Sequence, residues 1–296
     1  MEHNNKRRSL EPIYENLLGE SDAKRALDLF DEIEGGKYNK EEIHTFQLKS
    51  LKHPVSIRAI RADMQSFVNT FIDPYLENKP YLSNPAFVVD GGANIGCTAA
   101  LYANWWPDSK IVSVEADKEN YELTLINTKN YKNISVIHGG LWNKTADLKI
   151  EAGQEDGFVV REISVTDMVA PENVTKGISL GDLMKRYEAK GIDFLKLNVE
   201  GSEKEIFSSD FEPWLGVTRA MLIELHDGKN AGCSAVVFNT LAKYDFAVAE
   251  TANYGVLFVK EALYRAWYAE WYRESIYKPN INKTRFPEFY LDKESG

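Results

Sequence analysis

The first third of the chain carries hydrophobic residues mainly at helical spacing. This pattern predicts an amphipathic helix at 23–33, a short strand at 54–61 and a second helix at 64–72. Residues 1–20 are typical of a flexible or loosely docked arm. We therefore interpret residues 1–85 as an N-terminal, mainly helical cap.

From residue 86 onward, short apolar runs alternate with helical patterns. The predicted strands are 87–90, 110–116, 134–138, 193–201, 219–227, 246–251 and 254–260. The predicted helices are 94–105, 118–129, 179–191, 232–243 and one that opens at Ser202. A less regular insertion at 139–178 contains a predicted hairpin around the sequence ADLKI.

Polar residues and glycines predict how two of these helices begin and end. Ser179 is expected to cap the start of the helix at 179–191, and Gly191 is expected to cap its end. Ser202 and Glu205 have the spacing of a capping box.

The last two predicted strands are separated by only a short turn, which indicates an antiparallel hairpin. A seven-stranded, mostly parallel sheet that ends in such a hairpin resembles the plan of the Rossmann-like class I methyltransferase fold. We expect this α/β fold over residues 86–260, with a separate C-terminal extension at 261–296.

A glycine-rich loop follows the first strand of this region. Asp90 ends the strand, and Gly91, Gly92, Asn94 and Gly96 lead into the next helix. The small residues let a ligand approach the backbone, and the helix N-terminus offers free N–H groups. The loop lacks the G-x-G-x-x-G spacing of dinucleotide oxidoreductases. Asp90 could instead accept from an ammonium, which S-adenosylmethionine has and NAD lacks; a tight turn without any ligand is the alternative.

An acidic residue ends the second strand of the region. Glu115 follows Asp90 by twenty-five residues, where a carboxylate usually accepts from two ribose hydroxyls. Ala116 is expected to flank the adenosine. Leu141 and Trp142, after the third strand, lie where the adenine base would rest, although Trp142 fits a core position under the insertion equally well.

Charged and polar residues gather at the ends of the fourth and fifth strands. Lys196, Asn198 and Glu200 alternate along one strand, and Glu224 and His226 along the next, so each set is expected to face one side. His226 is predicted to be the general base because its unperturbed pKa lies nearest neutrality. Glu200 or Glu224 would orient it or take the proton instead.

Two other interpretations of these residues remain open. Lys196 and Glu224 could form a buried ion pair between neighbouring strands. Asn198, Glu200, Glu224 and His226 could together bind a metal, but no compact ligand motif supports this, so no metal is predicted.

Four motifs, VVDGGANIG, SVEAD, IDFLKLNVEGSE and LIELH, closely resemble those of the FkbM-type methyltransferases in order and spacing. The resemblance covers about residues 87–227. It implies S-adenosylmethionine as methyl donor and O-methylation of a hydroxyl on a sugar, a glycan or a polyketide-like natural product. The cofactor residues that it implies are Asp90, Gly92, Asn94, Gly96 and Glu115, and the transfer residues are Asn198, Glu200, Glu224 and His226.

The chain departs from the family pattern at one position. The family usually has an aspartate where this chain has Asn198. Asparagine keeps a carbonyl acceptor but cannot act as a base, which shifts the prediction toward His226 together with Glu200. Methylation of a peptide or another macromolecule, and a non-catalytic S-adenosylmethionine-binding scaffold, are the alternative functions.

Composition limits the partners. The formal net charge of −10 and the pI of about 5.2 argue against a broad nucleic-acid-binding face. The sequence has no apolar run of membrane-spanning length and no secretory h-region, and its two cysteines indicate a reducing, cytoplasmic environment. A small-molecule or glycan acceptor is therefore the expected partner.

The C-terminal extension is unusually rich in aromatic residues, at Tyr264, Trp267, Tyr268, Trp271, Tyr272, Tyr277, Phe286, Phe289 and Tyr290. One interpretation is a lid or platform whose rings stack on a sugar. The favoured interpretation is a helix that docks on the catalytic domain or on a second subunit, giving a homo-oligomer.

Overall fold

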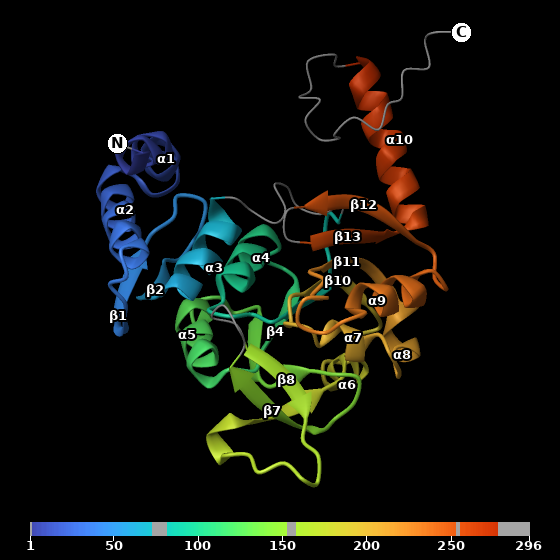
Figure 1. The fold of residues 1–296 in the computed structure, drawn as a ribbon. Coiled ribbons are helices and arrows are strands. Elements are labelled where there is room, and N and C mark those ends of the chain that lie inside the picture. The colour runs from blue at the N-terminus through green and yellow to red at the C-terminus, as the bar shows by residue number, and fades with distance from the viewer. Residues whose placement is uncertain (1, 73–81, 153–157, 253–254, 278–296) are drawn as a thin grey trace.

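The computed structural model describes residues 2–72, 82–152, 158–252 and 255–277. Its centre is a seven-stranded sheet with the order β12-β13-β11-β10-β3-β4-β5 (Figure 1). The strands are β3 (Phe87–Gly91), β4 (Lys110–Glu115), β5 (Ile134–His138), β10 (Ile192–Leu197), β11 (Thr218–Ile223), β12 (Phe246–Ala252) and β13 (Gly255–Lys260).

The sheet is mixed. Strand β13 runs antiparallel to both of its neighbours, β11 and β12, whereas the pairs β11–β10, β10–β3, β3–β4 and β4–β5 are parallel. Strands β12 and β13 form the predicted terminal hairpin. The Rossmann-like class I methyltransferase fold expected from the sequence is therefore confirmed.

Apolar residues on both faces of each central strand explain why the sheet is covered on two sides. In β3, Val88 joins the cluster on one face and Val89 the cluster on the other. The first face is covered by α3 (Arg61–Phe71), α4 (Cys97–Trp105) and α5 (Lys118–Thr128). The second is covered by α6 (Leu180–Arg186), α7 (Glu203–Ile206), α8 (Glu212–Leu215) and α9 (Cys233–Leu241).

The N-terminal region is more ordered than predicted. It contains α1 (Glu2–Leu18), α2 (Glu20–Glu34), β1 (Asn39–Phe46) and β2 (Val55–Ala59). The flexible arm predicted at 1–20 is wrong, because Tyr14 and Leu18 are buried and the Tyr14 ring packs on Phe30 of α2. The strand β1 was not predicted, because nearly all of its side chains are exposed and show no alternation.

The N-terminal region shares one hydrophobic cluster with the first face of the sheet. This cluster runs from Tyr14 through Phe46 and Phe67 to Phe194 on the central strand β10. In Figure 1 α2 lies beside β2 and α3, and residues of β2 and α3 line the same cavity as the ends of β3 and β4.

The insertion forms a second sheet below the carboxyl ends of the main strands. It comprises β6 (Gly140–Leu141), β7 (Asp147–Ala152), β8 (Phe158–Glu162), the 3₁₀ turn η1 (Pro171–Asn173) and β9 (Val174–Ile178). Strands β7 and β8 are the predicted hairpin, paired antiparallel.

The helix ends agree with the sequence prediction in one case only. Ser179 caps α6 by accepting from the backbone N–H of Asp182. The helix ends at Arg186, so Gly191 is not its cap; an added Cβ at Gly191 would lie 2.5 Å from the carbonyl oxygen of Val217, and this close approach requires glycine. The capping box is also wrong, because the Ser202 hydroxyl is buried without a partner and Glu203 bonds the preceding backbone instead.

The extension begins with α10 (Glu261–Tyr277), which contacts β12 and β13. Ring contacts run along this helix from Tyr264 to Trp267 and Tyr268, and from Tyr268 to Tyr272. Phe286, Phe289 and Tyr290 lie outside the described residues. The predicted homo-oligomer stays a prediction.

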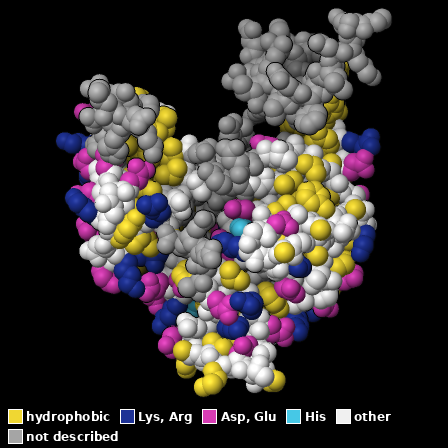
Figure 2. Space-filling view, viewed as in Figure 1, with side chains coloured by type: hydrophobic (Ala, Val, Ile, Leu, Met, Phe, Trp, Pro, Cys, Tyr) yellow, Lys and Arg dark blue, Asp and Glu magenta, His cyan; other side chains and the backbone are white. Residues whose placement is uncertain are grey.

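On the face shown in Figure 2, hydrophobic side chains of the described residues lie between charged and other polar ones. Basic side chains are scattered among acidic ones over this face. Both cysteines are buried free thiols. Within the described ranges, no helix is both long enough and apolar enough to cross a membrane.

Candidate functional site

A cavity of about 960 Å³ lies at the carboxyl ends of β3, β4 and β10. Ligands of open α/β sheets collect at this edge, and the volume lies at the upper end of the range for small-molecule sites. Four regions supply its described walls. The strand ends and their loops supply Gly92, Asn94, Val114, Glu115, Ala116, Asp117, Asn198, Val199, Glu200 and Ser202; the start of α5 supplies Glu119 and Asn120; the insertion supplies Gly139, Gly140, Leu141, Phe158 and Val160; the N-terminal region supplies Tyr38, Arg58, Ile60, Arg61, Ala62 and Gln65.

The glycine-rich loop packs tightly against the strand beside it. Gly92 has φ +72°, and an added Cβ would lie 1.8 Å from the carbonyl oxygen of Asn198. Asn94 also adopts a left-handed conformation, with φ 51°. Only glycine fits at position 92, because any side chain would push the loop away from β10.

A buried ion pair holds this loop from behind. Lys196 Nζ lies 3.3 Å from Asp90 Oδ1 and donates to the carbonyl oxygens of Gly92 at 2.7 Å and Gly91 at 3.3 Å. The predicted pair between Lys196 and Glu224 is therefore wrong. Lys196 pairs with Asp90 because β10 lies next to β3, where the two residues are register partners. Neither side chain is among the described walls of the cavity.

Lys196→Met is expected to lower the free energy of unfolding by about 2 kcal/mol. The change leaves the Asp90 carboxylate buried without its cation and two loop carbonyls without a donor. Urea unfolding of the full chain measures the effect, with the exposed Lys190→Met as control. Equal stability of the two variants would show that the pair does not hold the loop.

Glu115 closes the other side of the loop. Its Oε2 accepts from the backbone N–H of Asn94 at 2.7 Å, and its Oε1 accepts from that of Asp117 at 2.9 Å. Burial raises the pKa of Glu115 to about 7, although these two hydrogen bonds act in the opposite direction. The carboxylate therefore lies in the cavity wall with an ionisation close to neutral pH.

The remaining predicted cofactor residues divide into two groups. Ala116 and Leu141 line the cavity. Trp142 packs instead with Leu148 and Val160 in the small cluster under the insertion. Gly91 and Gly96 do not line the cavity but allow close packing, on Leu141 and on Thr124 respectively.

On the transfer side, Asn198 and Glu200 line the cavity. They do not alternate along a strand as predicted, because β10 ends at Leu197. Glu200 instead lies in a turn with φ 58°, a conformation that non-glycine residues adopt rarely and that is often found at functional sites. Lys229 forms an ion pair with its carboxylate.

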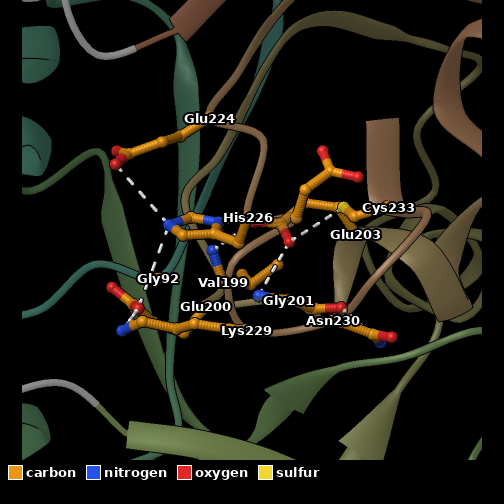
Figure 3. A network of polar contacts seen from close by, with 12 residues as sticks. Gly92, Val199, Glu200, Gly201, Glu203, Glu224, His226, Lys229, Asn230 and Cys233 are labelled. Carbon is orange, nitrogen blue, oxygen red and sulfur yellow. Dashed lines mark hydrogen bonds and ion pairs between the residues drawn. The ribbon is translucent and has the colours of Figure 1, made fainter. Parts of the chain in front are cut away.

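His226 lies among three carboxylates (Figure 3). Its Nδ1 bonds Glu203 Oε1 at 2.9 Å, and its Nε2 lies 3.5 Å from Glu224 Oε1 and 3.9 Å from Glu200 Oε2. The ring is largely buried. Of the residues predicted for the transfer side, His226, Glu200 and Glu224 lie together at this edge of the sheet.

The charge state of His226 differs from the prediction. Burial opposes the imidazolium, but the hydrogen bonds to Glu203 and Glu224 and the charge of Glu200 outweigh it and raise the pKa of His226 to about 10. At neutral pH the ring is therefore protonated and has no lone pair with which to accept a proton. His226 as general base conflicts with this environment.

Two sets of site residues were not predicted. The first is Glu203, which bonds His226. It is the last residue of the motif IDFLKLNVEGSE, and its place in that motif could have marked it as a site residue. The wall from Tyr38 to Gln65 was missed because its residues lie outside the four motifs that predicted the site. Arg58 anchors that wall through Asp63 and reaches Asn120 at the start of α5.

Three side chains in the cavity wall have buried polar atoms without a hydrogen-bond partner: Asn94 Oδ1, Asn198 Oδ1 and Ser202 Oγ. Buried polar groups are normally paired, so these atoms fit a polar ligand. Together with the Gly92 cradle and the Glu115 carboxylate, they suit a nucleoside that carries an ammonium. In the part of the chain that the structure describes, no group of three or more His, Cys, Asp and Glu side chains could hold a metal ion.

Several solved structures share features of this fold. Fibrillarin from Aeropyrum pernix, in complex with natively bound S-adenosyl-L-methionine, is 12% identical with a TM-score of 0.37, covering 64% of this chain and 70% of its own. A putative O-methyltransferase from Klebsiella pneumoniae is 7% identical with a TM-score of 0.38, covering 79% and 88%. At these TM-scores the likenesses carry no argument about function. No curated protein sequence matches this chain.

The family model for the methyltransferase FkbM domain matches residues 90–257, which is more than half of the chain. The match runs from the glycine-rich loop into the terminal hairpin, so it includes the strand-end loops of the cavity but not the wall from Tyr38 to Gln65. The chain therefore belongs to the FkbM methyltransferase family, and it is an S-adenosylmethionine-dependent methyltransferase.

Proposed function

We propose that the chain transfers a methyl group from S-adenosylmethionine to a hydroxyl of a sugar, a glycan or a polyketide-like natural product. The observation that carries this proposal is the single cavity that joins the Gly92 loop and Glu115 to Glu200. The volume of about 960 Å³ leaves room for an acceptor beside a nucleoside cofactor. Methyl transfer to a hydroxyl needs little beyond alignment of the two groups and removal of the hydroxyl proton.

The cofactor would be held by residues on the β3 and β4 side. Gly92 lets it approach the backbone, Glu115 would accept from the ribose hydroxyls, and Ala116 and Leu141 would flank the adenosine. Because Asp90 pairs with Lys196 and is not among the described cavity walls, we assign the acceptor for the ammonium to Asn198 Oδ1, a wall atom without a hydrogen-bond partner. When bound, the cofactor supplies a methyl group on a sulfonium.

The proton of the hydroxyl that receives the methyl group would pass to Glu200. This carboxylate lines the cavity, whereas His226 is protonated and is not among the described wall residues. His226 and Lys229 act on Glu200 from behind, as cations that hold its carboxylate in place. Glu224 lies at the same ring nitrogen of His226 as Glu200, with 3.5 Å between Nε2 and Glu224 Oε1 (Figure 3).

Cofactor affinity is expected to rise about tenfold from pH 6 to pH 8, because ribose hydroxyls donate to the ionised form of Glu115. The sign follows from the pKa of about 7, since the carboxyl is mostly protonated below it and mostly ionised above it. Calorimetric titration with S-adenosylmethionine at both pH values measures the change. In Glu115→Gln any remaining pH dependence comes from titration of the ligand itself. If the change in affinity between pH 6 and pH 8 were the same in this variant as in the wild type, Glu115 would be excluded as the ribose partner.

Methyl transfer tests the proposed function. The full chain is incubated with S-adenosylmethionine labelled in its methyl group and with panels of monosaccharides, glycans, polyketide alcohols and peptides. Label in the sugar or polyketide panels, as base-stable ethers, supports the proposal. Label in peptides alone would assign a macromolecular acceptor, and cofactor binding without transfer to any panel would favour a non-catalytic scaffold.

A further inference from the structure

Glu203 is a fully buried carboxylate whose two oxygens are both in use. It is the first residue of α7, and it turns back toward the segment between β10 and that helix (Figure 3). Oε1 accepts from the backbone N–H of Val199 at 2.9 Å and from His226 Nδ1 at 2.9 Å; Oε2 accepts from the backbone N–H of Gly201 at 2.8 Å and lies 3.8 Å from Cys233 Sγ.

Two of these contacts enclose Glu200. The amides of Val199 and Gly201 lie on either side of it in the chain, and both point at the same carboxylate. Glu200 has φ 58° and Gly201 has φ 102°, so this turn is held in a conformation that most residues avoid. Charge-assisted hydrogen bonds from the two amides that flank Glu200 are strong enough to stabilise such a turn.

The third contact reaches Glu200 by a second route. Glu203 occupies His226 Nδ1, so the other ring nitrogen, Nε2, is directed at Glu224 and Glu200. Lys229 holds the Glu200 carboxylate from another direction. Glu203 thus acts on Glu200 in two ways: it binds the backbone on both sides of that residue, and it orients the His226 ring beside the Glu200 carboxylate.

We propose that Glu203 is a positioning residue for methyl transfer, which fixes Glu200 at the cavity wall by binding the turn around it and by orienting His226 against its carboxylate. The inference rests on the proposed role of Glu200 as the proton acceptor. Glu203 itself does not line the described cavity, so it acts through these partners.

Among the three carboxylates that raise the pKa of His226 against the effect of burial, Glu203 is the one in closest contact with the ring. The titratable and charged groups near the ring are Glu200, Glu203, Glu224, Asp227, Lys204, Lys229 and Cys233. Lys229 is paired with Glu200, Lys204 bonds Asn230 and Ala231, and Asp227 bonds the backbone of Ser234. Burial raises the pKa of the Cys233 thiol to about 11, so it is neutral. Glu203 makes the shortest contact to the ring and is the carboxylate with no exposure.

The test is a pH titration of His226 in the full chain, observed by NMR of its ring nitrogens. It is carried out on the wild type, Glu203→Gln and Glu205→Gln. A glutamine at 203 offers one carbonyl oxygen to three N–H donors and brings an amide of its own that must turn away from them. Glu205 is the matched control, because it lies in the same helix and its side chain makes none of the described contacts to His226. Amide exchange of Val199 and Gly201 is measured on the same samples.

In the wild type and in Glu205→Gln, His226 is expected to stay protonated past pH 9. In Glu203→Gln the midpoint falls by at least about one pH unit, and the two amides exchange at least about tenfold faster. A wild-type midpoint near the ordinary value of a histidine would overturn the inference even if Glu203→Gln failed to fold. So would a Glu203→Gln variant with unchanged midpoint and exchange.

These readouts need neither cofactor nor acceptor. Failure of the proposed function would appear as absent methyl transfer with the His226 titration intact. Failure of the present inference would appear as an ordinary His226 titration in a chain that still transfers methyl groups.

Discussion

Gly92→Ala is expected to weaken S-adenosylmethionine binding by at least about a hundredfold, or about 3 kcal/mol. The added Cβ would lie 1.8 Å from the carbonyl oxygen of Asn198, so the loop and the end of β10 must separate by more than about 1 Å. That displacement moves the Asn94 amide away from Glu115 and opens the part of the cavity where the cofactor is proposed to lie. Calorimetric titration of the variant measures the loss.

Gly36→Ala is the matched control for this change. Gly36 also has a left-handed backbone, with φ +83°, but an added Cβ there would meet nothing within 4 Å. Gly36→Ala therefore measures only the cost of placing alanine in a left-handed backbone. We expect it to lower the free energy of unfolding by about 1 kcal/mol and to leave the cofactor affinity unchanged. If Gly92→Ala bound S-adenosylmethionine as tightly as Gly36→Ala, the cofactor would not depend on this loop.

Glu200→Gln is expected to lower kcat about a thousandfold with little change in cofactor affinity, because the amide cannot take up the proton of the substrate hydroxyl. The carboxylate lines the cavity and is partly exposed, so losing its ion pair with Lys229 costs stability only weakly. Steady-state kinetics with an acceptor found in the methyl-transfer screen measures kcat, and calorimetry measures affinity.

Glu188→Gln serves as the control for Glu200→Gln. Glu188 is another glutamate with a left-handed backbone, at φ 53°, and it is exposed after α6. Its substitution makes the same chemical change on a similar backbone away from the cavity. A Glu200→Gln enzyme with the turnover of Glu188→Gln would remove Glu200 from the proposed role.

The sequence predicted the position of Gly92, Asn94 and Glu115, because the determinants of these three residues are local. The glycine-rich loop and Glu115 each follow directly from a strand end, and the carboxyl ends of parallel strands meet at one edge of a sheet. Each residue could therefore be placed without knowing which strands are neighbours. The structure brings Gly92, Asn94 and Glu115 together at that edge as expected.

The partner of Lys196 could not be found in the same way. Its neighbours depend on the order of strands, which places β10 between β3 and β11. In that register Lys196 lies beside Asp90 on one side and Leu222 on the other. The sequence pattern of β10 is the same whichever strands flank it, so an ion pair with Glu224 looked equally reasonable.

The protonation of His226 was also beyond local reasoning. It depends on Glu200, Glu203 and Glu224, which come from a turn, a short helix and the residue after β11. Helix α7 has only four residues and shows no periodic pattern. The wall from Tyr38 to Gln65 was missed for a similar reason, since its place at the cavity depends on contacts between distant segments, such as that of Arg58 with Asn120 of α5.

The most direct test of the central claim, that the cavity at Gly92 and Glu115 binds S-adenosylmethionine, is a calorimetric titration of the full chain with this cofactor and, separately, with NAD. The account predicts one site with a micromolar Kd for S-adenosylmethionine, no heat with NAD, and loss of the site in Gly92→Ala but not in Gly36→Ala. Absence of S-adenosylmethionine binding to the wild type, or binding that survives Gly92→Ala unchanged, would contradict it.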